Sequence, residues 1–174
     1  MPPPRNAGTL STVAVRFHAD QTVHCLRDIA CGEELTISYV AGAEAGARNE
    51  RRHLLHRKFG FTCACDACVL DGVELMESDA RYRRVKEIHT LLAEEDLGEA
   101  LVPLVAEHYR LMRAEGVPLI LGKAGWILAI ASLVQSGALE AAVGWARLAA
   151  DCARVALGDD SSAYMQFAKI LGER

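Results

Sequence analysis

Three cysteines within six residues constrain this chain more than any other feature. Cys63, Cys65 and Cys68 directly follow an aromatic pair, Phe59 and Phe61. Zinc takes four ligands in tetrahedral geometry, and thiolates closely spaced in tight turns can converge on one ion. A redox dithiol usually lies as CxxC beside a strand–helix–strand unit, and no such unit surrounds these cysteines. The spacing therefore predicts a metal-binding loop, with three buried, unpaired thiols as the less favoured alternative.

The composition of the 174-residue chain is that of an ordinary globular protein, because 51% of its residues are hydrophobic and 24% are charged. A formal charge of −4 and a pI near 5.9 argue against a protein that binds nucleic acid directly. No apolar run is long enough for a signal peptide or a membrane span. We expect a protein of the nucleus or cytoplasm without membrane contact, where clustered cysteines are metal ligands rather than disulfide partners.

The first part of the chain alternates short strand-like runs with turns. Three runs rich in β-branched residues predict strands. They cover residues 12–15, 22–26 and 34–39. A helix is predicted at residues 47–59, ending at Gly60, with leucines on one face. Its other face is basic and is interpreted as solvated, with a contact to acidic protein or nucleic acid as the minority alternative. The basic residues are Arg48, Arg51, Arg52, His53, His56, Arg57 and Lys58.

The second part of the chain predicts helices throughout, because its apolar residues recur at spacings of three and four. The first helix would be capped by Ser78 or Asp79, and the last by Asp159, Asp160 or Ser161. The helices between them would cover residues 97–113, 118–135 and 138–157, and the last would run over 160–171. The two-residue junction at 136–137 makes its flanking helices antiparallel neighbours. Alanine-rich faces resemble tetratricopeptide-type hairpins, and a plain bundle is the equal alternative because no constant-period repeat is present.

Four further side chains that could carry chemistry are interpreted as structural. His89 and His108 fall on apolar helical faces, where histidines satisfied within the core are commoner than ligands. Cys25 and Cys152 lie in a strand-like and a helical run, and both are predicted core residues.

Two motifs give the first part of the chain a resemblance to a known family. Residues 27–39, RDIACGEELTISY, are similar to the strand–turn–strand motif of SET domains, the catalytic fold of protein-lysine methyltransferases. Residues 59–68, FGFTCACDAC, are similar to the family's post-SET element. The CxCxxC spacing followed by helices looks most like the SET and MYND subgroup and its fungal relatives. The match covers residues 12–70, and the two motifs at this distance are more specific than either alone.

The resemblance implies an α+β fold. A partial β-rich SET core with a cysteine-rich post-SET zinc loop would be followed by an all-α, helical-hairpin region of tetratricopeptide-like type. We therefore expect three parts: the C-terminal part of a SET domain at 1–58, the zinc-binding loop at 59–72 and an α-helical C-terminal domain at 73–174.

The resemblance also implies roles for individual residues. Tyr39 would be the catalytic tyrosine, and Phe61 would pack against the adenine of S-adenosylmethionine. Asn6 loosely matches an asparagine of the family's cofactor-binding segment, and the three cysteines of the loop would bind zinc. On residue chemistry alone, Tyr39 would instead be a strand-end tyrosine packed on the core. Phe61 would be the core-facing anchor of the loop, a role compatible with contacting the cofactor.

The implied reaction is methyl transfer from the sulfonium of S-adenosylmethionine to a lysine amine of a protein substrate, histone or not. That lysine must arrive neutral, although its unperturbed pKa is about 10.4. A fixed phenol oxygen at the mouth of an apolar channel can orient the amine. Positioning and desolvation would then supply most of the rate gain.

The sequence departs from the family pattern before residue 12. The family places there a glycine-bearing cofactor loop and an asparagine-histidine-serine-cysteine-x-proline-asparagine segment, which supplies the fourth zinc cysteine. Residues 2–8 of this chain read PPPRNAG. A three-thiolate site would need a water, another molecule or a remote residue such as Cys31 or His56.

The expected function is therefore that of a truncated C-terminal portion of an S-adenosylmethionine-dependent protein-lysine N-methyltransferase, weak or inactive alone. The alternative is a non-catalytic protein-interaction module. In that case the helical region would bind a protein partner and the zinc loop would be structural only.

Overall fold

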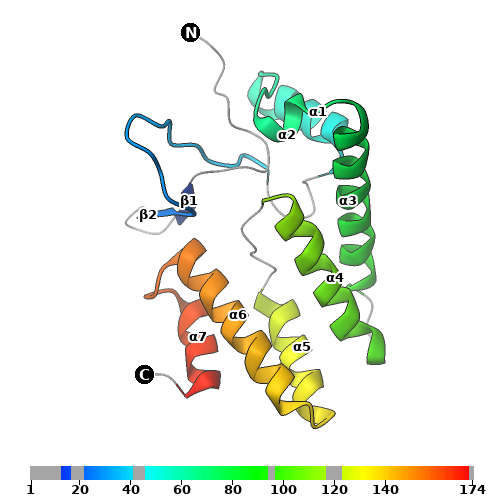
Figure 1. Ribbon diagram of the computed structural model, residues 1–174, viewed down its shortest axis with the longest axis vertical. Helices are drawn as coiled ribbons and strands as arrows, with labels where there is room; N and C mark the ends of the chain where they lie inside the picture. The colour runs from blue at the N-terminus through cyan, green and yellow to red at the C-terminus, as the bar shows by residue number, and fades with distance from the viewer. Residues whose placement is uncertain (1–12, 17–21, 41–45, 94–96, 117–122, 173–174) are drawn as a thin grey trace.

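The computed structural model describes residues 13–16, 22–40, 46–93, 97–116 and 123–172, and most of these are helical (Figure 1). The strands are β1 (Val13–Arg16) and β2 (Thr22–Cys25). The helices are α1 (Arg48–Phe59), α2 (Asp66–Val69), α3 (Gly72–Leu91), α4 (Leu101–Ala114), α5 (Lys123–Gln135), α6 (Leu139–Leu157) and α7 (Ser162–Leu171), with a 3₁₀ turn at Gly98–Ala100 before α4. None of the helices in these ranges combines the length and the apolar character needed to cross a bilayer.

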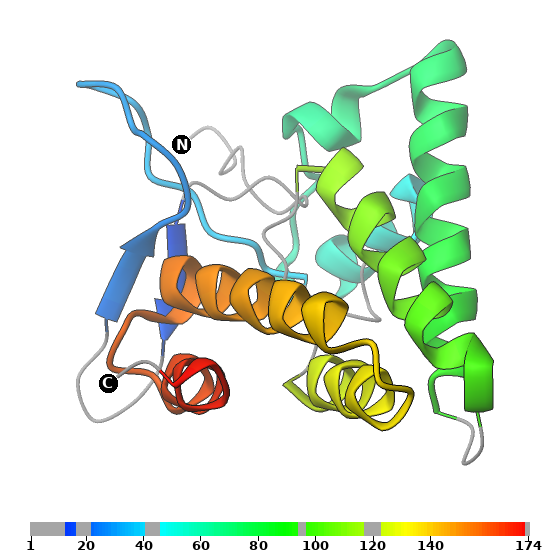
Figure 2. The ribbon, with the colours of Figure 1, turned by 60° about the horizontal axis from the view of Figure 1, so that its bottom comes forward.

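The strands form an antiparallel hairpin in which Val13 pairs with Cys25 and Arg16 with Thr22. This hairpin lies against α6 (Figure 2). The strand predicted at residues 34–39 is wrong, because these residues have no regular secondary structure and the described sheet has only two strands. A β-branched run becomes a strand only where another strand accepts its hydrogen bonds. The preceding turn is closed instead by Glu33, which accepts hydrogen bonds from the Arg27 guanidinium and from the Ala30 backbone N–H.

The helices from α3 onward pack in chain order, each against the next (Figures 1 and 2). The antiparallel pairing predicted for α5 and α6 is confirmed. One face of α6 is buried through small side chains, which let α5 and α7 approach closely. These residues are Ala142, Ala146, Ala149, Ala150, Ala153 and Ala156. The tetratricopeptide-like description and the division into three parts stay predictions.

The start of α3 differs from the prediction. The helix begins at Gly72, so neither Ser78 nor Asp79 caps it. The Ser78 side chain is buried within α3 and donates to Glu115 Oε2 at 2.7 Å, which ties α3 to the end of α4. Asp79 Oδ1 accepts the backbone N–H of Arg48 at 2.6 Å and therefore caps α1. Ser78 and Asp79, which the sequence suggested as caps of α3, thus form hydrogen bonds with neighbouring segments instead.

Two other helix starts were predicted, one at the last helix and one at residue 118. Ser161 is the N-cap of α7 and accepts the backbone N–H of Tyr164 at 3.2 Å, as one of the predicted alternatives required. The predicted start at residue 118 lies outside the described residues.

Gly158, between α6 and α7, allows the close approach of the hairpin. Its φ of 88° and ψ of 161° lie in a region that is essentially open to glycine alone. A Cβ there would meet Cε1 of His24 at 2.6 Å. We expect Gly158→Ala to lower the free energy of unfolding by about 1–3 kcal/mol, measured by urea denaturation.

A matched control for this substitution is Gly144→Ala, in the interior of α6. Gly144 is exposed, and a Cβ there would meet nothing within 4 Å. Alanine is the better helix former, so this change should raise the free energy of unfolding by about 0.5–1 kcal/mol. Effects of the same sign at both glycines would contradict the role assigned to Gly158.

Candidate metal centre and aromatic cluster

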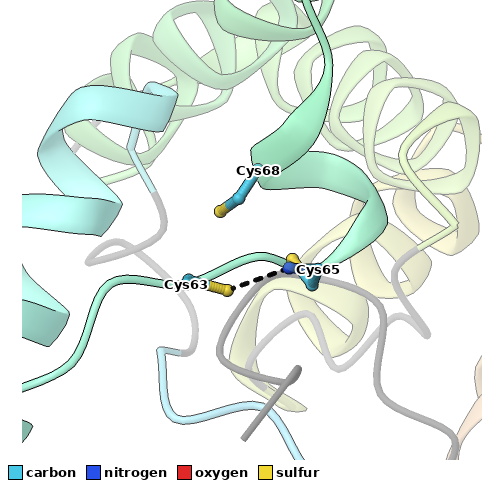
Figure 3. Close-up of side chains that lie close together, drawn as sticks. All are labelled: Cys63, Cys65 and Cys68. Atoms are coloured by element: carbon cyan, nitrogen blue, oxygen red, sulfur yellow. Dashed lines mark hydrogen bonds between the residues drawn. The ribbon is translucent and has the colours of Figure 1, made fainter. Parts of the chain in front are cut away.

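The three cysteines converge on one point in the structure (Figure 3). Their side chains are buried, and their sulfur atoms all lie within 4.8 Å of one another. Two thiolates bound to a tetrahedral zinc at about 2.3 Å lie about 3.8 Å apart. A contraction of about 1 Å would therefore bring these sulfurs to coordination distance, and a set of soft thiolates favours zinc over magnesium or calcium. The residues fit a zinc ion.

The local sequence explains this convergence. Gly60 ends α1 in the left-handed conformation, with φ 73°, and its N–H is bonded to the His56 carbonyl. Cys65 then takes an extended conformation, and its carbonyl accepts the backbone N–H of Cys68 at 2.8 Å. The resulting turn of α2 brings Cys68 back over Cys65. The Cys65 N–H in turn donates to Cys63 Sγ at 3.4 Å (Figure 3).

The pKa values of Cys65 and Cys68 are raised in the metal-free loop. Hydrogen bonding with Cys63 is the largest cause for both Cys65 and Cys68, and burial adds to it. The positive charge of Arg51 opposes this effect at Cys68. Cys65 and Cys68 are therefore thiols in the metal-free loop, and a bound cation would favour the thiolates and release protons.

Three arginines of α1 hold the backbone of the cysteine loop. Arg52 donates twice to the Cys63 carbonyl at 3.3 Å, Arg51 donates to Ala67 at 3.3 Å, and Arg48 donates to Leu70 at 2.8 Å. The predicted solvated face is wrong for Arg51, which is fully buried, and Arg48 and Arg52 are half-buried.

The rest of the basic segment is exposed as predicted: His53, His56, Arg57 and Lys58. Sequence reasoning missed the role of the three arginines. The sequence held one signal for this role. Arg51 lies four residues before Leu55 and therefore on the same face of the helix as that apolar residue.

The remote residues considered as a fourth ligand do not join the cluster. Cys31 and His56 are both exposed, and neither belongs to the group of potential metal ligands found among the described residues. Asn6, predicted to contact the cofactor, lies outside the described residues.

Beside the cysteine loop, three aromatic rings form a cluster. The Tyr39 ring lies 5.1 Å from Phe59 and 5.7 Å from Phe61, both edge-on, and the two phenylalanines are 6.4 Å apart. Tyr39 is 38% exposed and Phe59 is 49% exposed, so the cluster faces solvent on one side. Phe61 also packs against the buried cysteines. Two residues singled out from the sequence, Tyr39 and Phe61, are thus brought together, and Phe59 is an additional member.

The two helical histidines pair with each other. Nε2 of His89 lies 2.8 Å from Nε2 of His108, and the rings stack between α3 and α4. Burial lowers the pKa of both, to about 4 for His108, where the charge of His89 adds to the effect. Nδ1 of His108 has no hydrogen-bond partner among the described residues, so the predicted satisfaction within the core is incomplete.

The two other cysteines differ in burial. Cys152 is half-buried and packs against the helical core, in line with its prediction. The prediction that Cys25 is a core residue is wrong, because this side chain is exposed on β2.

Part of this sequence is similar to that of a known protein. Over 65 residues, 37% of its length, the chain is 34% identical to the histone-lysine N-methyltransferase set5 of Schizosaccharomyces pombe. The matched residues are 20% of that protein, so the chain spans about a fifth of the relative's length. No family model matches the chain. This relative is named a histone-lysine N-methyltransferase, and the similarity identifies no subgroup.

Proposed function

We propose that this chain forms the C-terminal part of the methyl-transfer site of a SET-type, S-adenosylmethionine-dependent protein-lysine N-methyltransferase. The observation that carries the proposal is the aromatic cluster around Tyr39, placed directly beside a cysteine loop that fits zinc. The partial similarity to a histone-lysine N-methyltransferase supports it. The chain alone would be weak or inactive, and it would act on a protein in the nucleus or cytoplasm.

In this proposal Tyr39 orients the target amine. S-adenosylmethionine, when bound, supplies an electron-poor methyl group, and Phe61 would pack against its adenine. The phenol oxygen of Tyr39 would hold the lysine amine in line, while Phe59 and Phe61 exclude water from one side. Loss of water disfavours the charged form of lysine, which keeps the amine nucleophilic. Positioning and desolvation together would lower the barrier.

Zinc would have a structural role in this site. Cys63 is two residues from Phe61, and the partly buried Phe61 packs against the buried cluster that contains Cys63. A metal held by the three thiols would fix the course of the backbone at Phe61 and thereby the geometry of the aromatic cluster.

A graft tests the proposed function. Residues 12–70 of this chain would replace the matching segment of the Schizosaccharomyces pombe relative. We expect the graft to transfer a labelled methyl group from S-adenosylmethionine to a lysine of a protein substrate, whereas the recipient without this segment sets the background. The measurement is incorporated label with mass spectrometry of the modified residue. A folded, zinc-loaded graft with background activity would contradict the proposal.

The alternative function is a non-catalytic interaction module built on the helical region. Val73 and Met76, three residues apart on α3, are each 69% exposed, which is unusual for large apolar side chains on one helical face. Under this alternative a protein partner would cover them, and the zinc loop would only support α3. An inactive graft, together with a partner contact that is lost in Met76→Ser, would favour it.

A further inference from the structure

Arg51 is a buried cation that forms no ion pair with a carboxylate among the residues that the structure describes. Its side chain is 0% exposed, and none of the described ion pairs includes it. The guanidinium donates to the carbonyls of Gly46 at 2.7 Å and Ala67 at 3.3 Å, and it lies 4.5 Å from the centre of the Tyr82 ring. Nε is buried and has no hydrogen-bond partner among the described residues. A buried charge that is not balanced is strongly unfavourable, so a negative group is expected nearby.

The neighbouring arginines on α1 share this environment. Arg48 lies three residues before Arg51, and Arg52 lies one residue after it. All three side chains donate hydrogen bonds to the same loop. Together they hold its carbonyls at the start, the middle and the end, which are those of Cys63, Ala67 and Leu70. Nε of Arg48 is also buried without a partner in the described structure. Positive charge is therefore concentrated where the three cysteines converge.

A charge balance identifies the missing negative group. When three thiols bind a divalent zinc ion, they release three protons to solvent, and the centre carries one negative charge in excess. A fourth thiolate would make the excess two. Arg51 donates to the Ala67 carbonyl of the same loop and is therefore placed close to this charge. Metal loading thus creates, beside Arg51, the anion that this buried cation lacks.

We propose that Arg51, with Arg48 and Arg52 in support, is the counter-ion of the metal-loaded cysteine loop and sets its affinity for zinc. This inference rests on the zinc site of the proposed function. Arg51 contacts neither substrate nor cofactor and is a positioning residue. Its charge offsets the excess of the thiolates, and its hydrogen bond to the Ala67 carbonyl helps to keep the loop in the coordinating shape. Partner groups around metal ligands contribute in this way to affinity.

The experiment measures metal affinity on the full 174-residue chain. Cobalt(II) reports thiolate coordination by its absorption bands, and zinc affinity follows from competition with a chromophoric chelator. We expect Arg51→Met to weaken zinc binding about 10- to 100-fold. Arg51→Lys keeps the charge and should retain most of the affinity. The control Arg57→Met removes an exposed arginine of the same helix and should bind zinc as the wild type does.

Three results would overturn the inference. Arg51→Met could bind zinc as tightly as the wild type while circular dichroism shows a folded protein. Arg51→Lys could be as weak as Arg51→Met, which would assign the effect to the shape of the guanidinium rather than to its charge. If the wild-type chain bound neither cobalt nor zinc, the zinc site of the proposed function would itself be refuted. This result differs from the other two, in which the wild type binds zinc and only the role of Arg51 fails.

Two further variants cover the case in which Arg51→Met does not fold. Arg48→Met and Arg52→Met each remove one half-buried arginine that holds the loop. Each should weaken zinc binding in the same direction by a smaller factor. If both variants bound zinc as tightly as the wild type, the inference would be overturned. Removing positive charge beside the loop would then have left its zinc affinity unchanged.

Discussion

Replacing Cys68 by serine is expected to remove tight zinc binding from this chain. Cys68 is fully buried, and its sulfur belongs to the converging set of three. Structural zinc sites contribute about 10–16 kcal/mol of binding free energy. Divided among four ligands, this is about 2.5–4 kcal/mol each, so that the loss of one thiolate should weaken zinc binding by about 60- to 700-fold. Chelator competition measures the affinity directly.

The same substitution should abolish most of the thermal stabilisation that zinc confers, because a metal that binds only the folded loop stabilises it by mass action. Cys25→Ser is the matched control, since Cys25 is exposed and lies outside the cluster. Wild-type zinc affinity in Cys68→Ser would show that the three thiols are merely buried side chains. Cys31→Ser adds a diagnostic: an equal loss there would identify Cys31 as a ligand after all.

Tyr39→Phe is expected to abolish methyl transfer in the graft described above. The substitution removes one hydroxyl group and keeps the ring that contacts Phe59 and Phe61. Folding and zinc content should therefore be unchanged. Loss of a single positioned polar group at a reacting centre lowers kcat on the order of 10²–10³-fold. Single-turnover transfer of a labelled methyl group from saturating S-adenosylmethionine measures the effect.

A second hydroxyl in the same segment provides the control for this substitution. Thr62→Val removes an exposed hydroxyl one residue from Phe61 and should leave activity within a few-fold of the unmodified graft. If Tyr39→Phe behaved as Thr62→Val does, Tyr39 would be an ordinary aromatic residue that packs beside the loop. That outcome would remove the catalytic role while leaving the zinc site intact.

The helical region was largely predictable, because its signals are local. Apolar spacing located α6 almost to the residue, and Ser161 capped α7 as one of the predicted alternatives. The strand predicted at residues 34–39 failed for the opposite reason. Its residues favour a strand, but a strand exists only where a partner lies beside it, and pairing is not encoded in the run itself.

The site was predicted in part. Tyr39 and Phe61 were each singled out, and the structure adds that their rings touch and that Phe59 completes the cluster. The predicted caps at Ser78 and Asp79 show how such reasoning fails, since both side chains are used by other helices. A short polar side chain satisfies whichever donor or acceptor the packed helices bring to it, and its sequence neighbours do not determine which one that is.

The sequence by itself determined where the three cysteines gather, because the turn that brings their sulfurs together forms within residues 60–68. It also determined where most helices run. Only the tertiary structure decided what surrounds that loop. In the sequence Arg51 is one more member of a basic run, yet folding buries it fully against Tyr82 and the Ala67 carbonyl. The physical reason is that burial of a charge depends on which distant elements pack over it.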